Sequence, residues 1–146
     1  MTIVIQPVLT DLPAGFDVLR QDARDEGHTN MERLATDWAS GANRFNAANE
    51  ALLAAFVADT LAGIGGLTID PAIPSALRMR RFYVRPAFRR HSVGRRLAGV
   101  LMTQARHATT CLVLNAEAEI AARFWEALGF VPDSRDGYTH IQRWPA

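Results

Sequence analysis

The first third of the chain predicts one strand followed by two helices. Residues 3–5 form a short apolar run, as expected for a strand. Asp11 supplies an N-cap residue and Pro13 an early-turn proline, a combination that predicts the start of a helix. Gly27 and Gly41 are predicted to end the first and the second helix. The apolar positions at helical spacing are Phe16, Leu19 and Ala23 in the first helix and Met31, Leu34, Ala35 and Trp38 in the second.

The middle of the chain predicts an antiparallel hairpin followed by another strand. Apolar runs at residues 51–58 and 61–69 are joined by Asp59 and Thr60, a spacing typical of a hairpin. A loop that contains two prolines then leads to a predicted strand at about residues 77–84. Three glycines in the second apolar run indicate a bulge or a close approach of another backbone segment. They are Gly63, Gly65 and Gly66.

The C-terminal half predicts two more helices and three short strands. A helix at residues 94–107 precedes a compact buried strand at 112–114, and a second helix follows at 117–128. Two strands are predicted near residues 130–131 and 138–143. The predicted inward-facing residues are Leu97, Val100, Leu101 and Ala105 in the first of these helices and Ile120, Phe124 and Leu128 in the second, which Gly129 ends.

Taken in order, the predicted elements are β-α-α-β-β-β-α-β-α-β-β, a pattern typical of a mixed α/β fold. The strand–helix–strand crossover in the C-terminal half predicts that part of the sheet is parallel. The chain has 146 residues and no repeat, low-complexity stretch or linker, so we expect a single domain over residues 1–146.

Charge is distributed unevenly along this chain. Eight of its 16 arginines lie between Arg78 and Arg96, and it contains no lysine. Ten of the 15 acidic residues precede Pro71, and none occurs from Pro71 to Ala116. A strand here runs into a turn with Pro86 and then into Gly94 at the head of a helix. This layout predicts a backbone cradle for a phosphorylated ligand, because N–H groups at a helix N-terminus bind phosphate oxygens.

Several classes of protein are disfavoured by the composition. The single cysteine, Cys111, allows no internal disulfide and no CxxC metal site, and we interpret it as a core residue. The four histidines lack the spacing of a metal site, so we expect no metal. The N-terminus has no basic leader followed by a long apolar stretch, and no run reaches membrane-spanning length. We therefore expect a cytoplasmic protein that does not interact with membranes.

Two segments match the motifs of a known family. Residues 82–86 are Phe-Tyr-Val-Arg-Pro, and residues 89–94 are Arg-Arg-His-Ser-Val-Gly. Residues 122–130 are Ala-Arg-Phe-Trp-Glu-Ala-Leu-Gly-Phe. In this order and spacing they resemble the GNAT superfamily of acetyl-CoA-dependent N-acetyltransferases. The first pair is similar to its signature strand and its Gln/Arg-x-x-Gly-x-Gly/Ala pyrophosphate loop, and the last is similar to its late helix, which commonly ends Phe-Tyr-Glu-x-Leu-Gly-Phe.

The resemblance implies a GNAT-like fold that binds acetyl-CoA as its co-substrate. Backbone N–H groups of the loop would bind the pyrophosphate, and arginine side chains would add charge-assisted contacts. The edge of the strand at residues 82–84 would hydrogen-bond the pantetheine arm. The implied cofactor-binding residues are Phe82, Tyr83, Val84, Arg89, Arg90, His91, Ser92, Val93, Gly94, Arg95, Arg96 and Trp125.

The chain departs from the family pattern at three positions. Ser92 stands where the loop usually has Gly, at a cost on the order of 1 kcal/mol if that position needs a positive φ. Trp125 stands where the family commonly has a Tyr that protonates the departing thiolate. Indole cannot act as an acid at neutral pH, so solvent or another donor would serve. Ala118 replaces an Asn often found near the start of that helix.

By resemblance, acetyl would pass by direct attack to a primary amine of a small molecule or peptide, with a backbone N–H near Val84 polarising the thioester carbonyl. The amine must lose a proton, so a base or a water chain is needed. Glu26 and His28 occupy the turn that overhangs the acceptor pocket in the family, and Tyr138 is a candidate replacement acid. The further residues that could act as the base are Glu50, Glu117, Glu119 and His140.

Other interpretations stay open at this point. The chain could be a non-catalytic CoA-binding sensor or subunit that has lost the usual Tyr. The arginine run could bind nucleic acid, although its turn and helix context favours a phosphate cradle, so we expect no nucleic-acid partner. Arg78, Arg80 and Arg81 lie upstream of the cradle and are interpreted as strand-face residues or as part of an acidic substrate's site. A homodimer is compatible with the resemblance, because the family often forms dimers.

Overall fold

A seven-stranded sheet forms the centre of the computed structural model, which describes residues 2–135 and 137–145. The strand order is β1-β2-β3-β4-β5-β7-β6, and all neighbours are antiparallel except β4 and β5, which are parallel. The mixed α/β prediction is therefore confirmed. The strands are β1 Ile3–Pro7, β2 Ala51–Val57, β3 Thr60–Ile69, β4 Leu77–Val84, β5 Cys111–Leu114, β6 Val131–Arg135 and β7 Tyr138–Arg143.

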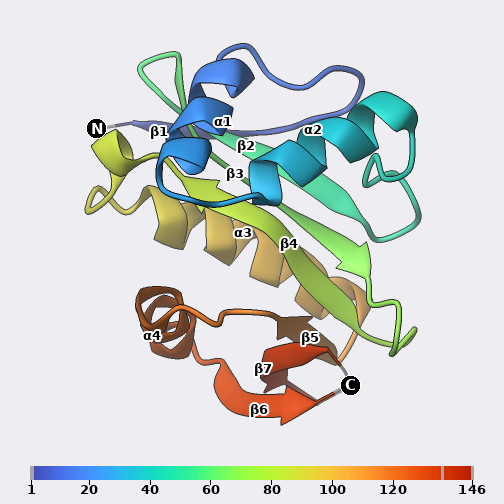
Figure 1. Ribbon diagram of the computed structural model, residues 1–146. Helices are drawn as coiled ribbons and strands as arrows, with labels where there is room; N and C mark the ends of the chain where they lie inside the picture. The colour runs from blue at the N-terminus through green and yellow to red at the C-terminus, as the bar shows by residue number, and fades with distance from the viewer. Residues whose placement is uncertain (1, 136, 146) are drawn as a thin grey trace.

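Helices cover both faces of this sheet (Figure 1). On β2, Leu52 and Ala54 pack into the cluster that holds α1 and α2, whereas Leu53 and Ala55 pack into the cluster that holds α3. Alternate residues of a strand point to opposite faces, so both faces of the sheet are buried. The helices are α1 Phe16–Asp25, α2 Asn30–Ser40, α3 Val93–Ala108 and α4 Glu119–Ala127, with a 3₁₀ turn at Pro86–Phe88. None of the helices in the described residues is both long and apolar enough to cross a bilayer.

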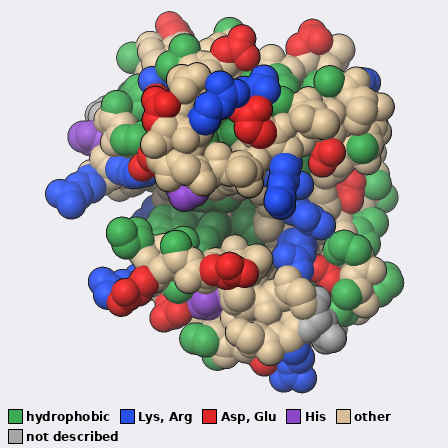
Figure 2. Space-filling model, viewed as in Figure 1, with side chains coloured by type: hydrophobic (Ala, Val, Ile, Leu, Met, Phe, Trp, Pro, Cys, Tyr) green, Lys and Arg blue, Asp and Glu red, His purple; other side chains and the backbone are tan. Residues whose placement is uncertain are grey.

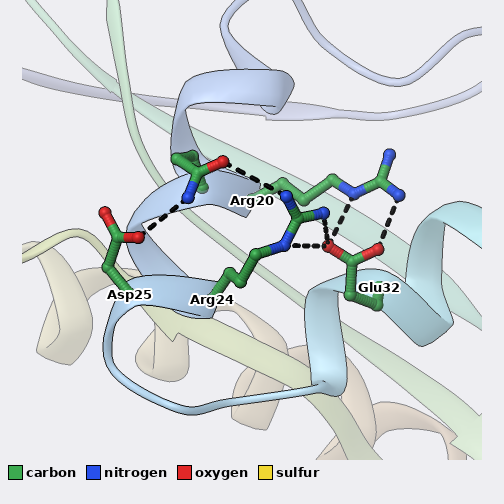
Figure 3. Close-up of polar contacts among 5 residues, drawn as sticks. Arg20, Arg24, Asp25 and Glu32 are labelled. Carbon is green, nitrogen blue, oxygen red and sulfur yellow. Dashed lines mark hydrogen bonds and ion pairs between the residues drawn. The ribbon is translucent and has the colours of Figure 1, made fainter.

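A polar network fixes α1 against α2 (Figure 3). Arg20 donates from Nε and Nη2 to the two carboxylate oxygens of Glu32, at 2.9 and 2.6 Å. Arg24 also donates to Glu32, and these hydrogen bonds lower the pKa of that carboxyl to about 2. The network holds the two helices in register at either side of the turn at residues 26–29.

The structure corrects several local expectations. The first helix begins at Phe16 instead of near Asp11, because Gly15 before it adopts a left-handed conformation with φ 88°. Ile120 is 83% exposed instead of inward-facing, and Val100 is 44% exposed. Each lies one position away from the stripe that its helix buries. On α4 that stripe consists of Ala121, Phe124, Trp125 and Leu128.

Candidate functional site

Strands β4 and β5 separate from each other partway along β4. Their register pairs are Leu77 with Leu112 and Arg78 with Val113, although β4 continues to Val84. Figure 2 shows the result, a cleft with hydrophobic side chains on its floor between the half that carries α1 and α2 and the half that carries α4. The cleft lies where the resemblance places the pantetheine arm and the thioester.

A bulge shapes the β4 side of this cleft. Tyr83 is paired with Ile64 and Arg80 with Gly66, so two residues of β4 lie opposite Gly65 alone. Arg81 takes up the extra length with φ 54°. Gly65 is required here because a Cβ on it would lie 2.6 Å from Cδ2 of Phe82. The bulge that the three glycines predicted is therefore confirmed.

The bulge leaves the backbone N–H of Val84 directed toward the cleft. Arg85 N donates to Ala62 O of the β2–β3 hairpin at 2.8 Å. In an antiparallel ladder, alternate residues bond to the same neighbour, so the preceding N–H, that of Val84, points away from β3. On that side β5 has already diverged. Val84 thus presents a backbone donor on the cleft side, at the position where the resemblance implies the polarising N–H.

The cradle is built by backbone conformation at the head of α3. Arg90 has φ 65° and Ser92 has φ 67°, on either side of His91. Left-handed residues in such a turn direct successive N–H groups into one concavity, which is an anion-binding arrangement. Arg96 N makes a helical bond to Ser92 O at 2.9 Å, which leaves the N–H groups of residues 93–95 without intrahelical partners.

Two residues of the loop show why it needs its particular sequence. Ser92 occupies the left-handed region, so the family's usual glycine at this position has a conformational reason. A Cβ on Gly94 would lie 3.3 Å from Cε1 of Phe124 and 3.5 Å from Cγ2 of Val84. Gly94 thus lets the head of α3 approach both α4 and β4, which closes the inner end of the cleft.

The arginines of the loop divide into two groups. Arg89 donates from Nε to Val84 O at 3.0 Å and from both terminal nitrogens to Glu26, at 2.8 and 2.6 Å. Its guanidinium therefore binds α1's end in this structure instead of facing the cradle. Arg90, Arg95 and Arg96 are exposed, and no ion pair holds them within the described part of the chain. These three side chains are the ones available to an anion at the cradle.

Glu26 is fully engaged by its neighbours. Tyr83 donates from its hydroxyl to Oε1 of Glu26 at 2.5 Å, and the ring of His28 lies edge-on to Tyr83 at 6.0 Å. The hydrogen bonds from Arg89 lower the pKa of Glu26 to about 2. Burial raises the pKa of Tyr83. A carboxylate this acidic is a poor base, so its evident contribution is to connect the α1–α2 turn to the loop.

Aromatic side chains connect β4 to α4. Trp125 is 6% exposed, and its ring centroid lies 4.8 Å from that of Phe82, 4.9 Å from Phe124 and 5.5 Å from Phe130. The contacts with Phe82 and Phe124 are edge-to-face, a favourable arrangement for aromatic pairs. The position that the family fills with a Tyr is thus part of a packed aromatic wall.

Most of the other ionisable candidates have structural partners, whereas Glu117 is exposed. Glu50 accepts from the backbone N–H groups of Ala47 and Ile69 at 3.2 and 2.9 Å, and Glu119 pairs with Arg123. His140 lies 2.8 Å from both Glu126 and Thr139. Tyr138 is buried against Val113 and Ile141, in a cluster separate from that of Trp125. Within residues 2–135 and 137–145, no three His, Cys, Asp or Glu side chains gather as metal ligands would.

Two features escaped the sequence analysis because they join distant segments. Arg85 binds Asp22 of α1 at 2.7 Å, so Arg85 and Arg89 together anchor the loop between β4 and α3 (residues 85–92, the proposed cofactor loop) to the end of α1. A polar pocket of about 490 Å³ lies between the end of α2 and strands β3 and β4, with Arg80 and Arg81 in its wall. The arginine run was the only sequence signal for either feature.

The chain was compared with known families, proteins and structures. Residues 13–130 match the model of the acetyltransferase (GNAT) family. A comparison with curated protein sequences gave no match. A predicted acetyltransferase from Exiguobacterium sp. 255-15 has a similar structure, with a TM-score of 0.88 and 26% identity over 98% of this chain and 94% of that one.

Two further structures show the same fold at lower identity. An acetyltransferase from Streptococcus agalactiae is 18% identical, with a TM-score of 0.72 over 97% of this chain and 98% of its own. The PaiA N-acetyltransferase from Thermoplasma acidophilum, solved in complex with coenzyme A, is 17% identical, with a TM-score of 0.66 over 99% and 100% of the two chains. The chain belongs to the GNAT family and is an acetyl-CoA-dependent acetyltransferase.

Proposed function

We propose that this protein transfers acetyl from acetyl-CoA to a primary amine by direct attack. The observation that carries the proposal is the position of the cradle. Unpaired N–H groups at the head of α3 lie beside the cleft that opens where β4 and β5 separate. A diphosphate bound to these N–H groups would allow a pantetheine arm to run along the cleft. Holding both reactants in one geometry is itself a large contribution to the rate.

The cofactor contacts follow from this placement. The diphosphate accepts hydrogen bonds from N–H groups between His91 and Arg95, and the exposed side chains of Arg90 and Arg96 add charge. The pantetheine amides pair with the free edge of β4 at residues 82–84. The Val84 N–H is directed to the thioester oxygen, where negative charge develops in the transition state, and a donor aimed there lowers the barrier.

In this proposal His28 is the general base that removes the proton of the attacking amine, directly or through water. The low pKa of Glu26 makes that residue a positioning group, which holds Tyr83 and Arg89 in place. His28 is exposed on the turn that faces the C-terminal end of β4, and its ring contacts Tyr83. An imidazole nitrogen can accept the proton of an amine, and histidine is the most frequent general base in enzymes.

The departing thiolate needs no strong acid. A thiol has a pKa of about 8.5, so its anion is a fair leaving group that solvent can protonate. Trp125 then serves as an apolar wall, and Tyr138 is the alternative proton donor to test. A Tyr138→Phe variant that keeps its turnover would leave solvent as the donor.

The direct experiment measures free thiol after purified protein receives acetyl-CoA and a panel of amines. The panel contains amino acids, amino-acid amides, polyamines, aminoglycosides and short peptides. Turnover with at least one amine is expected, and saturable CoA binding without turnover across the panel would contradict the proposal. His28→Ala should lower kcat/KM, whereas substitution of His107, an exposed histidine in the last turn of α3, by alanine should leave kcat/KM unchanged.

A further inference from the structure

Two consecutive arginines of β4 lie on the same face of the sheet. Side chains of a regular strand alternate, so Arg80 and Arg81 would point to opposite faces. The bulge inserts one residue at this position, with Arg81 at φ 54°. Arg81 therefore faces Asp37 on α2, and both guanidinium groups line the polar pocket between α2 and the sheet.

Arg80 has no carboxylate partner within the described residues. Its one side-chain hydrogen bond runs from Nε to Thr68 Oγ1 at 3.2 Å. The nearest buried acid is Asp70, whose Oδ1 accepts from Arg78 at 2.8 Å and whose Oδ2 accepts from two loop N–H groups. Burial lowers the pKa of Arg80, and the positive charges of Arg78 and Arg81 lower it further. A desolvated cation beside like charges is unfavourable until an anion joins it.

Arg81 is only loosely paired. Its Nη2 lies 3.8 Å from Asp37 Oδ2, beyond hydrogen-bond distance, and its side chain is 15% exposed. Burial lowers its pKa as well. The guanidinium can thus take a further acceptor without breaking an existing hydrogen bond.

Two further charged groups in the pocket wall are engaged by the backbone. Arg44 donates to Trp38 O at 2.9 Å, and Glu50 accepts two backbone N–H groups. The volume of about 490 Å³ lies in the range of small-molecule sites. The pocket therefore offers two underused guanidinium groups in a polar frame that is already formed.

Arg81 in the wall of this pocket lies three residues before Val84, where acetyl would be transferred, a distance of about 10 Å along a strand. Arg81 directly precedes Phe82, whose carbonyl accepts a hydrogen bond from Asn30 Nδ2 at 3.4 Å. Oδ1 of Asn30 is buried and has no hydrogen-bond partner among the described residues. The free edge of β4 at residues 82–84 begins one residue after Arg81, and a strand advances about 3.3 Å per residue.

We infer that the acetyl acceptor is an amine that also carries a carboxylate, of amino-acid to dipeptide size, with the carboxylate bound by Arg80 and Arg81. The inference rests on the proposed acetyl transfer and names its substrate class. The carboxylate takes hydrogen bonds from the two guanidinium groups, and the amine extends past the bulge toward the thioester. A polyamine would instead bring an ammonium group next to two desolvated cations.

The test on the unmodified protein uses matched acceptors. Thiol release from acetyl-CoA is measured for L-leucine against L-leucinamide, glycylglycine against its amide, and 4-aminobutyrate against butylamine, with spermidine added. Because these amines differ in basicity, each kcat/KM is expressed per fraction of free amine. We expect the carboxylate member to lead by roughly 10- to 100-fold in at least one pair, the range of a charge-assisted hydrogen bond.

Substitutions then test which residues cause the preference for the carboxylate acceptor. Arg80→Gln and Arg81→Gln should each remove most of this preference by raising KM for the carboxylate acceptor, while the affinity for CoA, measured by calorimetry, stays unchanged. Arg80→Lys, which keeps the charge, should retain part of it. Arg106→Gln is the matched control, because it removes an exposed charge of α3 outside the pocket wall and should keep the full preference.

Binding of product analogues gives a reading that does not require turnover. Thermal shift of the CoA-saturated protein is compared for N-acetyl-L-leucine and N-acetyl-L-leucinamide. Stabilisation by the acid alone, lost in Arg80→Gln, is expected. Equal or faster acetylation of neutral amines or spermidine, with no effect of either glutamine variant, would overturn the inference and leave the acetyl transfer standing. If no amine is acetylated, the proposed acetyl transfer is wrong. Equal binding of N-acetyl-L-leucine and N-acetyl-L-leucinamide would then show that the proposed carboxylate site at Arg80 and Arg81 is wrong as well.

Discussion

In the proposed complex, the two faces of the sheet make their ligand contacts by different means. On the face that α3 covers, the contacts come from the backbone: a left-handed pair at Arg90 and Ser92 and the unpaired N–H groups that follow. On the face that α1 and α2 cover, they come from side chains, above all Arg80 and Arg81, which a bulge places together. Backbone contacts suit a cofactor shared by a family, whereas side chains can differ with each acceptor.

Two arginines join these two regions of the molecule. The cofactor loop reaches the other face through Arg89, which connects Val84 O to Glu26 at the end of α1. Arg85 repeats the connection through Asp22. The α1–α2 turn and the cradle are therefore held in a fixed relation by ion pairs that are only partly buried.

The largest effect is expected from Gly94→Glu, which changes a residue of the proposed phosphate cradle at the head of α3. The new side chain would press on Phe124 and place a carboxylate beside the diphosphate. Like charges in contact cost several kcal/mol, so CoA affinity by calorimetry should fall at least about 100-fold. Gly99→Glu is the matched control on the same helix, because nothing lies within 4 Å of a Cβ there. Equal CoA affinity of the two variants would refute the cradle.

Glu26→Gln tests the connection between the two regions. The side chain of Glu26 is 30% exposed, so after screening its ion pair should contribute about 1 kcal/mol of unfolding free energy at pH 7. The folded-state pKa of about 2 lies below the usual value, so this stability is present above about pH 4.5 and is lost as the pH falls through 2. Urea unfolding of wild type and variant should therefore differ at pH 7 and converge near pH 2.

The same variant should weaken CoA binding by up to about fivefold, because the loop loses one of its anchors. Glu32→Gln is the control: its carboxylate is equally acidic, yet it joins only α1 to α2. It should leave CoA affinity unchanged. If both variants change CoA affinity alike, the loop does not depend on the contact with Glu26.

The strand and helix pattern could be predicted from the sequence because apolar spacing reports which side chains a sheet or helix buries. The turn and the helix start that frame the proposed cradle could be predicted as well, because Pro86 favours a turn and Gly94 falls at the head of α3. The partner of Arg89 could not, since Glu26 lies 63 positions away and no local pattern connects them. The exposure of Ile120 was missed for a related reason. Its helix contacts the core along a narrow stripe, and a shift of one residue decides which side chain is covered.

Ser92→Gly tests whether the left-handed conformation of residue 92 costs stability. A left-handed residue with a side chain costs on the order of 1 kcal/mol, so the glycine should raise the unfolding free energy by about that amount. The midpoint of thermal unfolding should rise by roughly 2–4 °C. Ser92→Ala keeps the Cβ and should bring no gain. A stabilised alanine variant would mean that the hydroxyl, not the backbone, is the source of the effect.

The smallest effect is expected from Trp125→Phe. If the indole is only a wall of the aromatic cluster, thiol release at saturating acetyl-CoA should change by no more than about threefold, less than the tenfold that 1.4 kcal/mol would give. A hundredfold loss would show that the indole N–H takes part in the reaction. Circular dichroism of the variant checks that its packing survives.

The decisive experiment is a crystal structure of the protein with bound CoA. We expect oxygens of the diphosphate to lie within hydrogen-bond distance of main-chain nitrogens between His91 and Arg95, with the thiol end in the cleft beside Val84. Density for the diphosphate at another surface, or contacts made by arginine side chains alone with those nitrogens still facing solvent, would contradict it.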